Sequence, residues 1–357
     1  MSTLISEPES SARAVDRPHA QPADEAGRAD DPVGAGPSGY AIRADALVRH
    51  YNGNRAVDEV DLRIPAGEIY GFLGPNGAGK STTVRMLCTL LAPTGGRAEV
   101  AGYDIASRPG QVRLRIGVAL QEAALDPKQT GYELLRLQGR LYGLGGKALA
   151  RRLDELGELI ELGDALGRQI GTYSGGMQRR LDLAAALVHN PEVLFLDEPT
   201  TGLDPASRAR AWSEIRRLNE QLGTTIFLTT QYLEEADELA HRVGIIDRGR
   251  IVAEGTPAEL KRSVGTDVIV ARVAGDAQAA CRALSAVPGV LSAEAHGEEL
   301  IVATADGAAA ISPVAVALAG SKVAVRDLTL RTPTLDDVFL ELTGTHIERT
   351  SSREEPS

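Results

Sequence analysis

The segment Gly74–Thr82 constrains the fold of this chain more than any other part of the sequence. It follows a short apolar run, Ile69–Leu73, and precedes a helical pattern that continues to Leu91. Its residues are Gly74, Pro75, Asn76, Gly77, Ala78, Gly79, Lys80, Ser81 and Thr82, which fit the pattern G-x-x-x-x-G-K-[ST]. The glycines allow a tight turn in which consecutive N–H groups point inward, and the helix start adds partial positive charge. The segment therefore predicts a polyphosphate-binding loop between a buried strand and a helix.

Two side chains of this phosphate loop have the chemistry that a nucleoside triphosphate requires. Lys80 carries a positive charge that can bridge the β- and γ-phosphates of a nucleotide. Ser81 carries a hydroxyl group that can ligate Mg²⁺. We therefore expect a nucleotide and its Mg²⁺ ion to bind at this loop.

A pair of carboxylates follows a second apolar run. Val193–Leu196 is uninterrupted by polar residues, which is typical of a parallel strand that is buried on both faces. Asp197 ends this predicted strand, where it can hold Mg²⁺ through water, and Glu198 can polarise the attacking water as a general base. An isolated Asp-Glu pair is more often a cap of the next turn. The preceding phosphate loop favours the catalytic interpretation.

A second turn with the character of an anion site precedes another amphipathic helix. Ser174, Gly175 and Gly176 stand at the start of a segment whose apolar residues recur with helical spacing. One nucleotide has one γ-phosphate, which the phosphate loop already surrounds. The turn is therefore either a simple serine N-cap or a site that faces a nucleotide held by another copy of the protein.

The motifs together resemble those of ABC-type ATPases. Gly74–Thr82, Gln121, Tyr173–Gln178, Leu194–Glu198 and Thr201–Asp204 stand in the order found in that family, and the resemblance extends from about Tyr40 to Leu260. It implies an ATP-hydrolysing subunit that works as a homodimer with an integral-membrane permease. ATP and Mg²⁺ are the implied ligands.

The resemblance also assigns roles at individual positions. Tyr51 would stack on adenine with Val57 packed nearby, although Tyr51 also suits an ordinary strand position. Gln121 would contact Mg²⁺ and the attacking water, and Asp204 would organise the dimer interface. The turn formed by Ser174, Gly175 and Gly176 would close over the nucleotide of the opposite subunit.

Three segments narrow the resemblance to the drug-export branch typified by daunorubicin-resistance ATPases. They are Thr229–Asp237, Gly255–Leu260 and Pro333–Leu340. Most ABC ATPases have a histidine where this chain has Gln231, and that histidine contacts the γ-phosphate. A glutamine amide can donate a hydrogen bond but cannot carry a positive charge. We therefore expect modest turnover, with Glu198 contributing most of the water activation.

The pattern of apolar runs predicts an α/β fold with two terminal tails. Residues 1–39 and 347–357 have almost no large apolar residues, so we expect them to be disordered. Residues 40–262 read as a phosphate-loop, RecA-like ATPase domain, with a helical subdomain at 122–172 that the resemblance assigns to permease contact. Residues 263–346 have the order βαββαβ, which suggests a small ferredoxin-like α+β domain.

Composition limits the classes of partner. The formal net charge of −11 and the scattered arginines disfavour a nucleic-acid surface. The two cysteines have no metal-like spacing, and neither a signal peptide nor an apolar run long enough to span a bilayer is present. We expect a peripheral protein at the cytoplasmic face of a bacterial membrane.

Several functional alternatives remain open. The cargo is expected to be a drug or antibiotic, with lipids or cell-envelope precursors as the alternative. A soluble ABC ATPase of ribosomes or DNA is disfavoured, since the chain has a single cassette and no heptad run. A non-catalytic regulatory cassette, suggested by Gln231, is disfavoured by the intact Lys80, Asp197 and Glu198. The segment Leu335–Leu340 is either a docking or dimerisation contact or a helix packed on its own chain.

Overall fold

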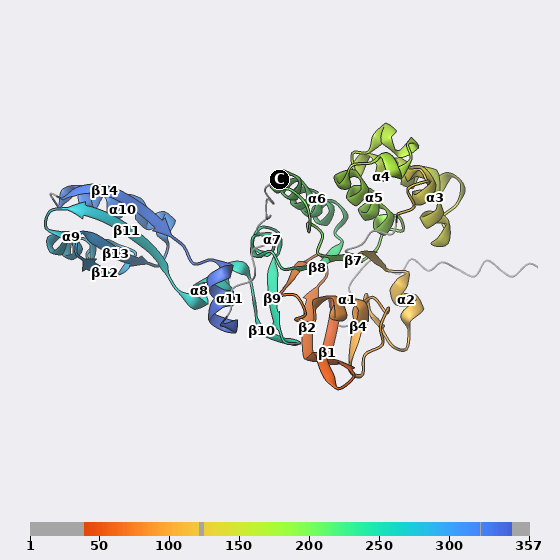
Figure 1. Ribbon diagram of the computed structural model, residues 1–357, viewed down its shortest axis with the longest axis horizontal. Helices are drawn as coiled ribbons and strands as arrows, with labels where there is room; N and C mark the ends of the chain where they lie inside the picture. Colours follow the sequence, from red (N-terminus) through yellow and green to blue (C-terminus); the bar gives the residue numbers. More distant parts are fainter. Residues whose placement is uncertain (1–38, 121–124, 322, 345–357) are drawn as a thin grey trace, which may run out of the picture. The chain divides into compact units, whose positions relative to one another are not determined.

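The computed structural model describes residues 39–120, 125–321 and 323–344 (Figure 1). The tails predicted at 1–39 and 347–357 lie outside these residues, apart from Gly39, and so does Gln121.

A six-stranded sheet carries the loops that the sequence singled out. Its strand order is β10-β9-β3-β8-β7-β6, and all neighbours are parallel except the pair β9 and β10. The strands are β3 (Ile69–Leu73), β6 (Ile116–Ala119), β7 (Val193–Asp197), β8 (Thr225–Thr230), β9 (Arg242–Asp247) and β10 (Arg250–Gly255). β9 and β10 form a hairpin. Because β3, β7 and β8 are parallel, the loops that follow them leave the same edge of the sheet.

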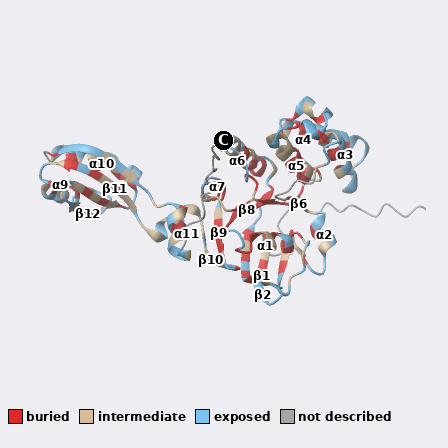
Figure 2. Cartoon of the chain, in the orientation of Figure 1, coloured by how far each residue is buried: buried red, intermediate tan, exposed pale blue. Residues whose placement is uncertain are grey.

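Burial on both faces explains why the central strands read as uninterrupted apolar runs. Val193 and Phe195 of β7 belong to one hydrophobic core, and Leu194 and Leu196 belong to another. All of β7 and β8 is buried, which appears as red strands in Figure 2. A polar side chain on either face would lose its hydration, so the alternating pattern of a half-exposed strand is absent here.

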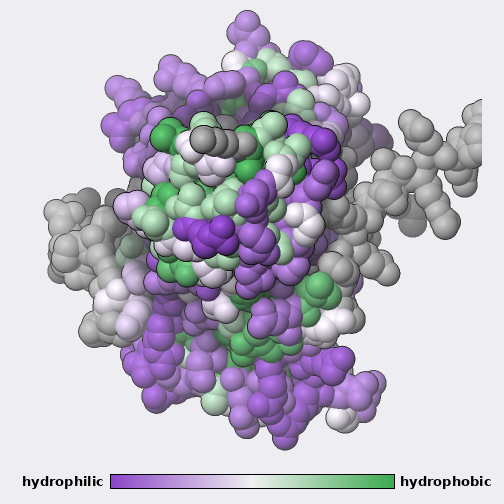
Figure 3. All heavy atoms as spheres, turned by 90° about the vertical axis from the view of Figure 1, so that its left-hand side faces the viewer, coloured by the Kyte–Doolittle hydropathy of each residue, from purple (hydrophilic) through white to green (hydrophobic). Residues whose placement is uncertain are grey.

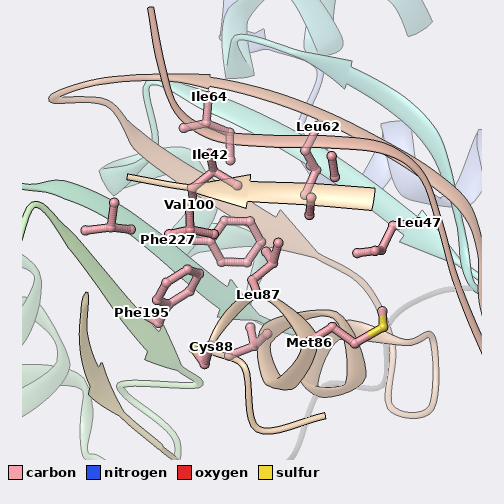
Figure 4. Close-up of a cluster of buried hydrophobic side chains, with 14 of the residues drawn as sticks. Ile42, Leu47, Leu62, Ile64, Met86, Leu87, Cys88, Val100, Phe195 and Phe227 are labelled. Carbon is pink, nitrogen blue, oxygen red and sulfur yellow. The ribbon is translucent and has the colours of Figure 1, made fainter. Parts of the chain in front are cut away.

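An antiparallel sheet covers one of these cores. Its strand order is β2-β1-β4-β5, formed by β1 (Tyr40–Tyr51), β2 (Asn54–Pro65), β4 (Gly95–Val100) and β5 (Tyr103–Asp104). Ile42, Leu62 and Val100 from this sheet pack with Phe195 and Phe227 of the parallel sheet and with Leu87 of α1, as Figure 4 shows. The helix α1 (Lys80–Leu87) ends four residues before the predicted Leu91, because Thr89 adopts a positive φ of 61°.

Helices cover the other face of the parallel sheet. They are α3 (Gly131–Leu141), α4 (Gly146–Leu159), α5 (Gly175–Leu187) and α6 (Pro205–Leu222), with short helical turns at Gly163–Gly167 and Ile170–Thr172. Leu135, Leu156 and Leu181 from three of these helices share one core with Leu194 and Leu228 of the sheet. The helical content predicted for residues 122–172 is thus present in its described part. Two shorter helices complete this region, α2 (Pro109–Arg113) and α7 (Leu233–Leu239).

The C-terminal residues form a separate antiparallel sheet with two helices. Its elements are β11 (Asp267–Ala274), α9 (Ala277–Leu284), β12 (Val290–His296), β13 (Glu299–Thr304), α10 (Gly307–Gly320) and β14 (Ala324–Arg331). The chain order is the predicted βαββαβ, and the strand order in the sheet is β12-β13-β11-β14. Ile269, Leu300 and Leu318 belong to its own hydrophobic core.

Two further helices join the C-terminal segment to the ATPase region. α8 (Pro257–Val264) and α11 (Leu335–Thr343) both begin with a capping box, at Thr256 and Thr334. Leu335, Val338 and Phe339 of α11 share one core with Leu260 of α8 and Leu73 of β3. The apolar residues of Leu335–Leu340 are therefore used in packing on the chain itself. This outcome favours the second of the two interpretations of that segment.

The described residues contain no helix that combines the length and hydrophobicity needed to cross a membrane. On the face shown in Figure 3, hydrophobic residues form small patches among hydrophilic ones. Cys88 is buried and Cys281 is half-buried, and both are free thiols.

Candidate functional site

The phosphate loop connects β3 to α1, as predicted. Gly79 is the N-cap of α1 with φ 112°, a left-handed conformation that disfavours a side chain. A Cβ atom at Gly74 would lie 2.3 Å from the carbonyl oxygen of Ile246, so the close packing of the loop on β9 also requires glycine. The pocket at this loop is lined by Ala56, Pro75, Asn76, Gly77, Gly79, Lys80, Ser81, Thr82, Glu198 and Gln231.

Lys80 is held against the loop and against one carboxylate. Its Nζ donates hydrogen bonds to the carbonyl oxygens of Gly74, at 2.7 Å, and Pro75, at 3.1 Å. Nζ also lies 3.5 Å from Oε1 of Glu198. Burial lowers the pKa of the Lys80 ammonium group, and the charges of Glu198 and Asp197 oppose that shift. The cation is thus fixed at the place where phosphate oxygens would approach.

Asp197 and Glu198 occupy the end of β7 beside this loop. The hydroxyl of Ser81 donates to Oδ1 of Asp197 at 3.3 Å. Glu198 has a positive φ of 49°, so the chain turns sharply as the strand ends. Oε2 of Glu198 accepts a hydrogen bond from the Thr201 hydroxyl at 3.2 Å. The side chain of Glu198 therefore lies between Lys80 and the turn that follows the strand.

Thr229 of β8 links the two carboxylate residues, and the sequence analysis gave it no role. Its hydroxyl donates to Oδ1 of Asp197 and accepts from the backbone N–H of Glu198 at 3.1 Å. Thr229 is fully buried and pairs with Asp197 across the parallel strands. Only the strand order brings these residues together, so the sequence held no direct signal for this contact.

Of the other residues predicted to contact the nucleotide, some line this pocket and some do not. Gln231 follows β8 and lines the pocket with Lys80 and Glu198. The side chain of Val57 is fully buried in the core, and its neighbour Ala56 lines the pocket, so the packing of Val57 near adenine stays a prediction. Tyr51 at the end of β1 is 40% exposed, with the Arg49 guanidinium group 4.7 Å from its ring centroid. Its contact with adenine stays a prediction.

The serine-glycine turn lies at a different pocket. Ser174 is the N-cap of α5 and accepts a hydrogen bond from the backbone N–H of Met177 at 3.3 Å. Ser174, Gly175 and Gly176 line a pocket together with Asp204, which is the N-cap of α6. Among the described residues, this pocket shares no lining residue with the pocket of the phosphate loop. The two turns that the sequence predicts to bind anions thus line two different pockets.

The donor set at the phosphate loop resembles the kind that Mg²⁺ uses with nucleotides. The described residues contain no group of three or more His, Cys, Asp or Glu side chains suited to a metal ion. Ser81 and Asp197 offer one hydroxyl and one carboxylate, which lie within hydrogen-bonding distance of each other. Mg²⁺ is commonly bound by one or two carboxylates plus phosphate oxygens and water, so these residues fit the ion.

Comparison with protein families identifies two regions of the chain. Residues 57–201 match the ABC transporter family. Residues 255–343 match the C-terminal domain of DrrA1-3-like ATP-binding proteins. The second match includes both α8 and α11.

Curated relatives cover most of the chain. The daunorubicin resistance ATP-binding protein DrrA2 of Streptomyces coeruleorubidus is 49% identical over 88% of this chain and 99% of its own length. The daunorubicin/doxorubicin resistance ATP-binding protein DrrA of Streptomyces peucetius is also 49% identical, over 88% of this chain and 96% of its own. The linearmycin resistance ATP-binding protein LnrL of Bacillus subtilis is 35% identical over 85% and 98% of the two chains.

Solved structures agree on the cassette fold. CbiO1 from Clostridium perfringens, part of the ABC transporter complex cbiONQ, matches with a TM-score of 0.59 and 27% identity over 62% of this chain and 90% of its own. The dimeric post-hydrolysis state of the cassette MJ0796 bound to ADP and Pi matches with a TM-score of 0.55 and 25% identity, over 60% and 98%. With its phosphate loop, its paired carboxylates and these end-to-end matches, the chain belongs to the ATP-hydrolysing ABC transporter ATP-binding proteins of the DrrA daunorubicin-resistance type.

Proposed function

We propose that this ATPase drives export of a drug or antibiotic through a separate integral-membrane permease at the cytoplasmic face of a bacterial membrane. The observation that carries the proposal is the alignment with daunorubicin resistance proteins, which spans 88% of this chain and 99% of the first relative at 49% identity. The DrrA-like C-terminal segment, residues 255–343, supports the same branch.

The proposed chemistry is in-line attack of water on the γ-phosphorus of ATP, which breaks the bond to the oxygen bridging the β-phosphate and releases ADP and inorganic phosphate. Lys80 neutralises charge on the β- and γ-phosphates, and Glu198, beside the loop, takes the proton of the attacking water as general base. Gln231 donates a neutral hydrogen bond toward the γ-phosphate, and Tyr51 stacks on the adenine ring. Ser81 and Asp197, with Gln121, would hold Mg²⁺, which supplies positive charge to the phosphates when bound.

We further propose that two copies of the chain complete each catalytic site. The proposal is supported by the turn of Ser174, Gly175 and Gly176, which lines a pocket that shares no described lining residue with the phosphate-loop pocket of its own chain. A second copy would supply that turn, with Asp204 at the interface. The DrrA-like C-terminal sheet, with its βαββαβ order, would be a ferredoxin-like unit beside the cassette domain of residues 40–262.

Drug resistance in a sensitive bacterial host tests the transport proposal. The chain is co-expressed with a candidate permease from the same organism, and the minimal inhibitory concentration of daunorubicin is measured. We expect a rise of several-fold with the wild type and no rise with Lys80→Ala. Lys80→Ala removes the contact with phosphate, so it should abolish resistance if export depends on ATP. If transport does not need ATP, resistance with Lys80→Ala would equal that with the wild type.

The cargo is tested separately from the ATPase. A relative from Cupriavidus metallidurans, 42% identical over 82% of this chain, is named a Nod factor export ATP-binding protein, so drugs are not the only cargo in this group. If Lys80-dependent ATPase activity is intact and no drug tested is exported, the drug proposal fails. Accumulation of a lipid or cell-envelope precursor in a deletion strain would then support the second candidate.

A further inference from the structure

Glu235 is a fully buried carboxyl group to which the proposed reaction assigns no role. It lies on α7, four residues after Gln231, inside the segment Thr229–Asp237 that the sequence analysis recognised only as a branch motif. Burying a carboxyl group is expensive, and an apolar side chain of similar size is often at least as stable in such a place. The retained carboxyl group is therefore explained by the groups that it holds.

Two hydrogen-bond donors and one further side chain, from three separate segments, interact with this carboxyl group. Oε1 of Glu235 accepts from the Thr200 hydroxyl at 2.8 Å and from Nε1 of Trp212 at 3.2 Å. The Thr230 side chain at the end of β8 also interacts with the carboxyl group, whose Oε2 has no hydrogen-bond partner among the described residues. Burial raises the pKa of the Glu235 carboxyl, and the side chains of Thr230, Thr200 and Trp212 and the charge of Arg208 oppose the shift.

Each donor belongs to a segment that carries a proposed catalytic or dimer-forming residue. Thr200 lies between Glu198 and Asp204, and its carbonyl oxygen accepts from the backbone N–H of Leu203 at 3.2 Å. Thr230 immediately precedes Gln231, and its hydroxyl accepts from the backbone N–H of Tyr232 at 2.8 Å. Glu235 therefore contacts two loops. One is the turn that follows Glu198, the proposed general base, and the other is the loop that carries Gln231, the proposed γ-phosphate contact.

A second contact ties the same two segments together. The guanidinium group of Arg208, on the first turn of α6 after Asp204, lies 4.5 Å from the ring centroid of Tyr232. The loop of Gln231 is thus held from α6 as well as from α7. Any shift of that loop must carry the turn after Glu198 with it or break these contacts.

We propose that Glu235 is a positioning residue that joins the loop of Gln231 to the turn between Glu198 and Asp204. The inference rests on the proposed roles of Gln231 and Glu198 in ATP hydrolysis. Glu235 touches neither nucleotide nor water; it fixes the relative placement of the two loops on either side of the γ-phosphate. Trp212, which donates to the same oxygen, moves with them.

The chain contains one tryptophan, so the fluorescence of Trp212 reports on this contact directly. Binding of ATP to the full chain is measured by equilibrium dialysis, and Trp212 emission is followed in the same samples. In the wild type we expect emission to change as ATP binds. In Glu235→Leu, which keeps the volume but removes the acceptor, we expect ATP binding to persist and the emission response to be lost.

Steady-state kinetics separates positioning from stability. Glu235→Leu should lower kcat by about tenfold to a hundredfold with little change in KM for ATP, as expected when catalytic groups are misplaced. Glu235→Gln keeps a carbonyl acceptor for Thr200 and Trp212, so it should restore most of kcat and the emission response. Thr200→Val removes one of the hydrogen-bond donors. If the two residues act through their mutual contact, Thr200→Val should lower kcat less in the Glu235→Leu protein than in the wild type.

Distinct results separate failure of this proposal from failure of the proposed function. A folded Glu235→Leu protein with wild-type kcat, or a wild-type emission that ignores bound ATP, would overturn the role of Glu235. If Glu235→Leu does not fold, Glu235→Gln and Thr200→Ser are used instead, because both keep the hydrogen bond between the two side chains. A loss of kcat in both of these variants as large as that expected for Glu235→Leu would also overturn the role of Glu235. Failure of the proposed function would instead appear as full ATPase activity in Lys80→Ala.

Discussion

Thr229 shows how one hydroxyl group can organise two catalytic residues. It connects the backbone of Glu198 to the carboxylate of Asp197 from the neighbouring strand, without reaching the pocket surface itself. A hydroxyl group is suited to this position because it donates and accepts at the same time. A side chain of the same shape without that group would leave both partners less satisfied.

The Thr229→Val change tests this contact. We expect kcat for ATP to fall about tenfold, because Oδ1 of the buried Asp197 loses one of its two donors, keeps only Ser81, and can reorient. The control is Thr225→Val on the same strand, where the hydroxyl accepts from the backbone N–H of Gly67 at 2.9 Å, away from the pocket. Both changes should destabilise the fold by about 1–2 kcal/mol. Equal kcat in the two variants would contradict the assignment.

Two partly buried groups, one on α5 and one just after it, should give opposite dependences of stability on pH. Burial raises the pKa of Asp182 to about 6 and lowers the pKa of His189 to about 4. The raised pKa of Asp182 contributes stability at low pH that is lost as pH rises from about 4 to about 6. The lowered pKa of His189 contributes stability above about pH 6.5 that is lost as pH falls toward about 4.

Single variants should separate the two effects. Each shift corresponds to roughly 3 kcal/mol by linkage, so the wild type should show little net slope from this pair. In Asp182→Asn, the free energy of unfolding should rise more steeply between pH 4 and pH 6 than in the wild type. In His189→Gln, it should fall relative to the wild type as pH rises through the same range. Urea unfolding at four pH values checks both slopes, and parallel curves for all three proteins would refute the prediction.

The roles of the residues near the pocket could be predicted only in part from the sequence. The phosphate loop and the pair Asp197-Glu198 follow from local patterns, because each lies at the end of an apolar strand. Thr229 and Glu235 could not be assigned, since their partners are set by strand order and helix packing.

At the scale of elements, α11 is the least expected participant in the ATPase core. Its buried residues contact α7 and α8, and they share a core with the strand that ends at the phosphate loop. The sequence predicted an apolar helix here but could not say whether its face met a partner protein or its own chain. An amphipathic pattern has the same form in either case.

Phe339 and Leu342 form a matched pair on α11. Phe339 is fully buried, whereas Leu342 is 42% exposed. Phe339→Ala should lower the free energy of unfolding by about 3–5 kcal/mol, because it leaves a cavity in the shared core. Leu342→Ala should change it by less than about 1 kcal/mol. Urea unfolding compares the two, and similar losses would show that α11 does not pack on the cassette.

The regular strands were the most predictable elements. β3 and β7 agree with the apolar runs to within one residue, because strands that are buried on both faces consist mostly of apolar residues. The end of α1 was not predictable, since the left-handed backbone of Thr89 has no strong sequence signal. The βαββαβ order of the C-terminal sheet follows from its alternating patterns, but its strand order does not.

At the scale of the whole molecule, the two proposed anion-binding turns of one chain lie in separate pockets. Two copies of the chain would therefore have to combine to complete a site. Each proposed site would need the phosphate loop of one copy and the Ser174 turn of another. A chain with a defective phosphate loop and a chain with a defective turn would each form inactive homodimers. A mixed dimer of the two would still contain one intact site.

A mixing experiment tests whether two copies of the chain complete each site. Lys80→Ala and Gly176→Glu proteins are purified separately, combined in equal amounts with the permease, and assayed for ATP hydrolysis. We expect each variant alone to be inactive and the mixture to recover up to about a quarter of wild-type activity, because half of random dimers are mixed and each has one site of two. No recovery in a mixture that forms mixed dimers would mean that Ser174–Gly176 act on their own chain.

The core shared by Leu73 and Phe339 also bears on how the protein is made. The strand that presents the phosphate loop cannot complete its packing until α11 has left the ribosome and folded back. Chains cut short before α11 would leave the apolar surface of this core uncovered, which exposes them to proteolysis.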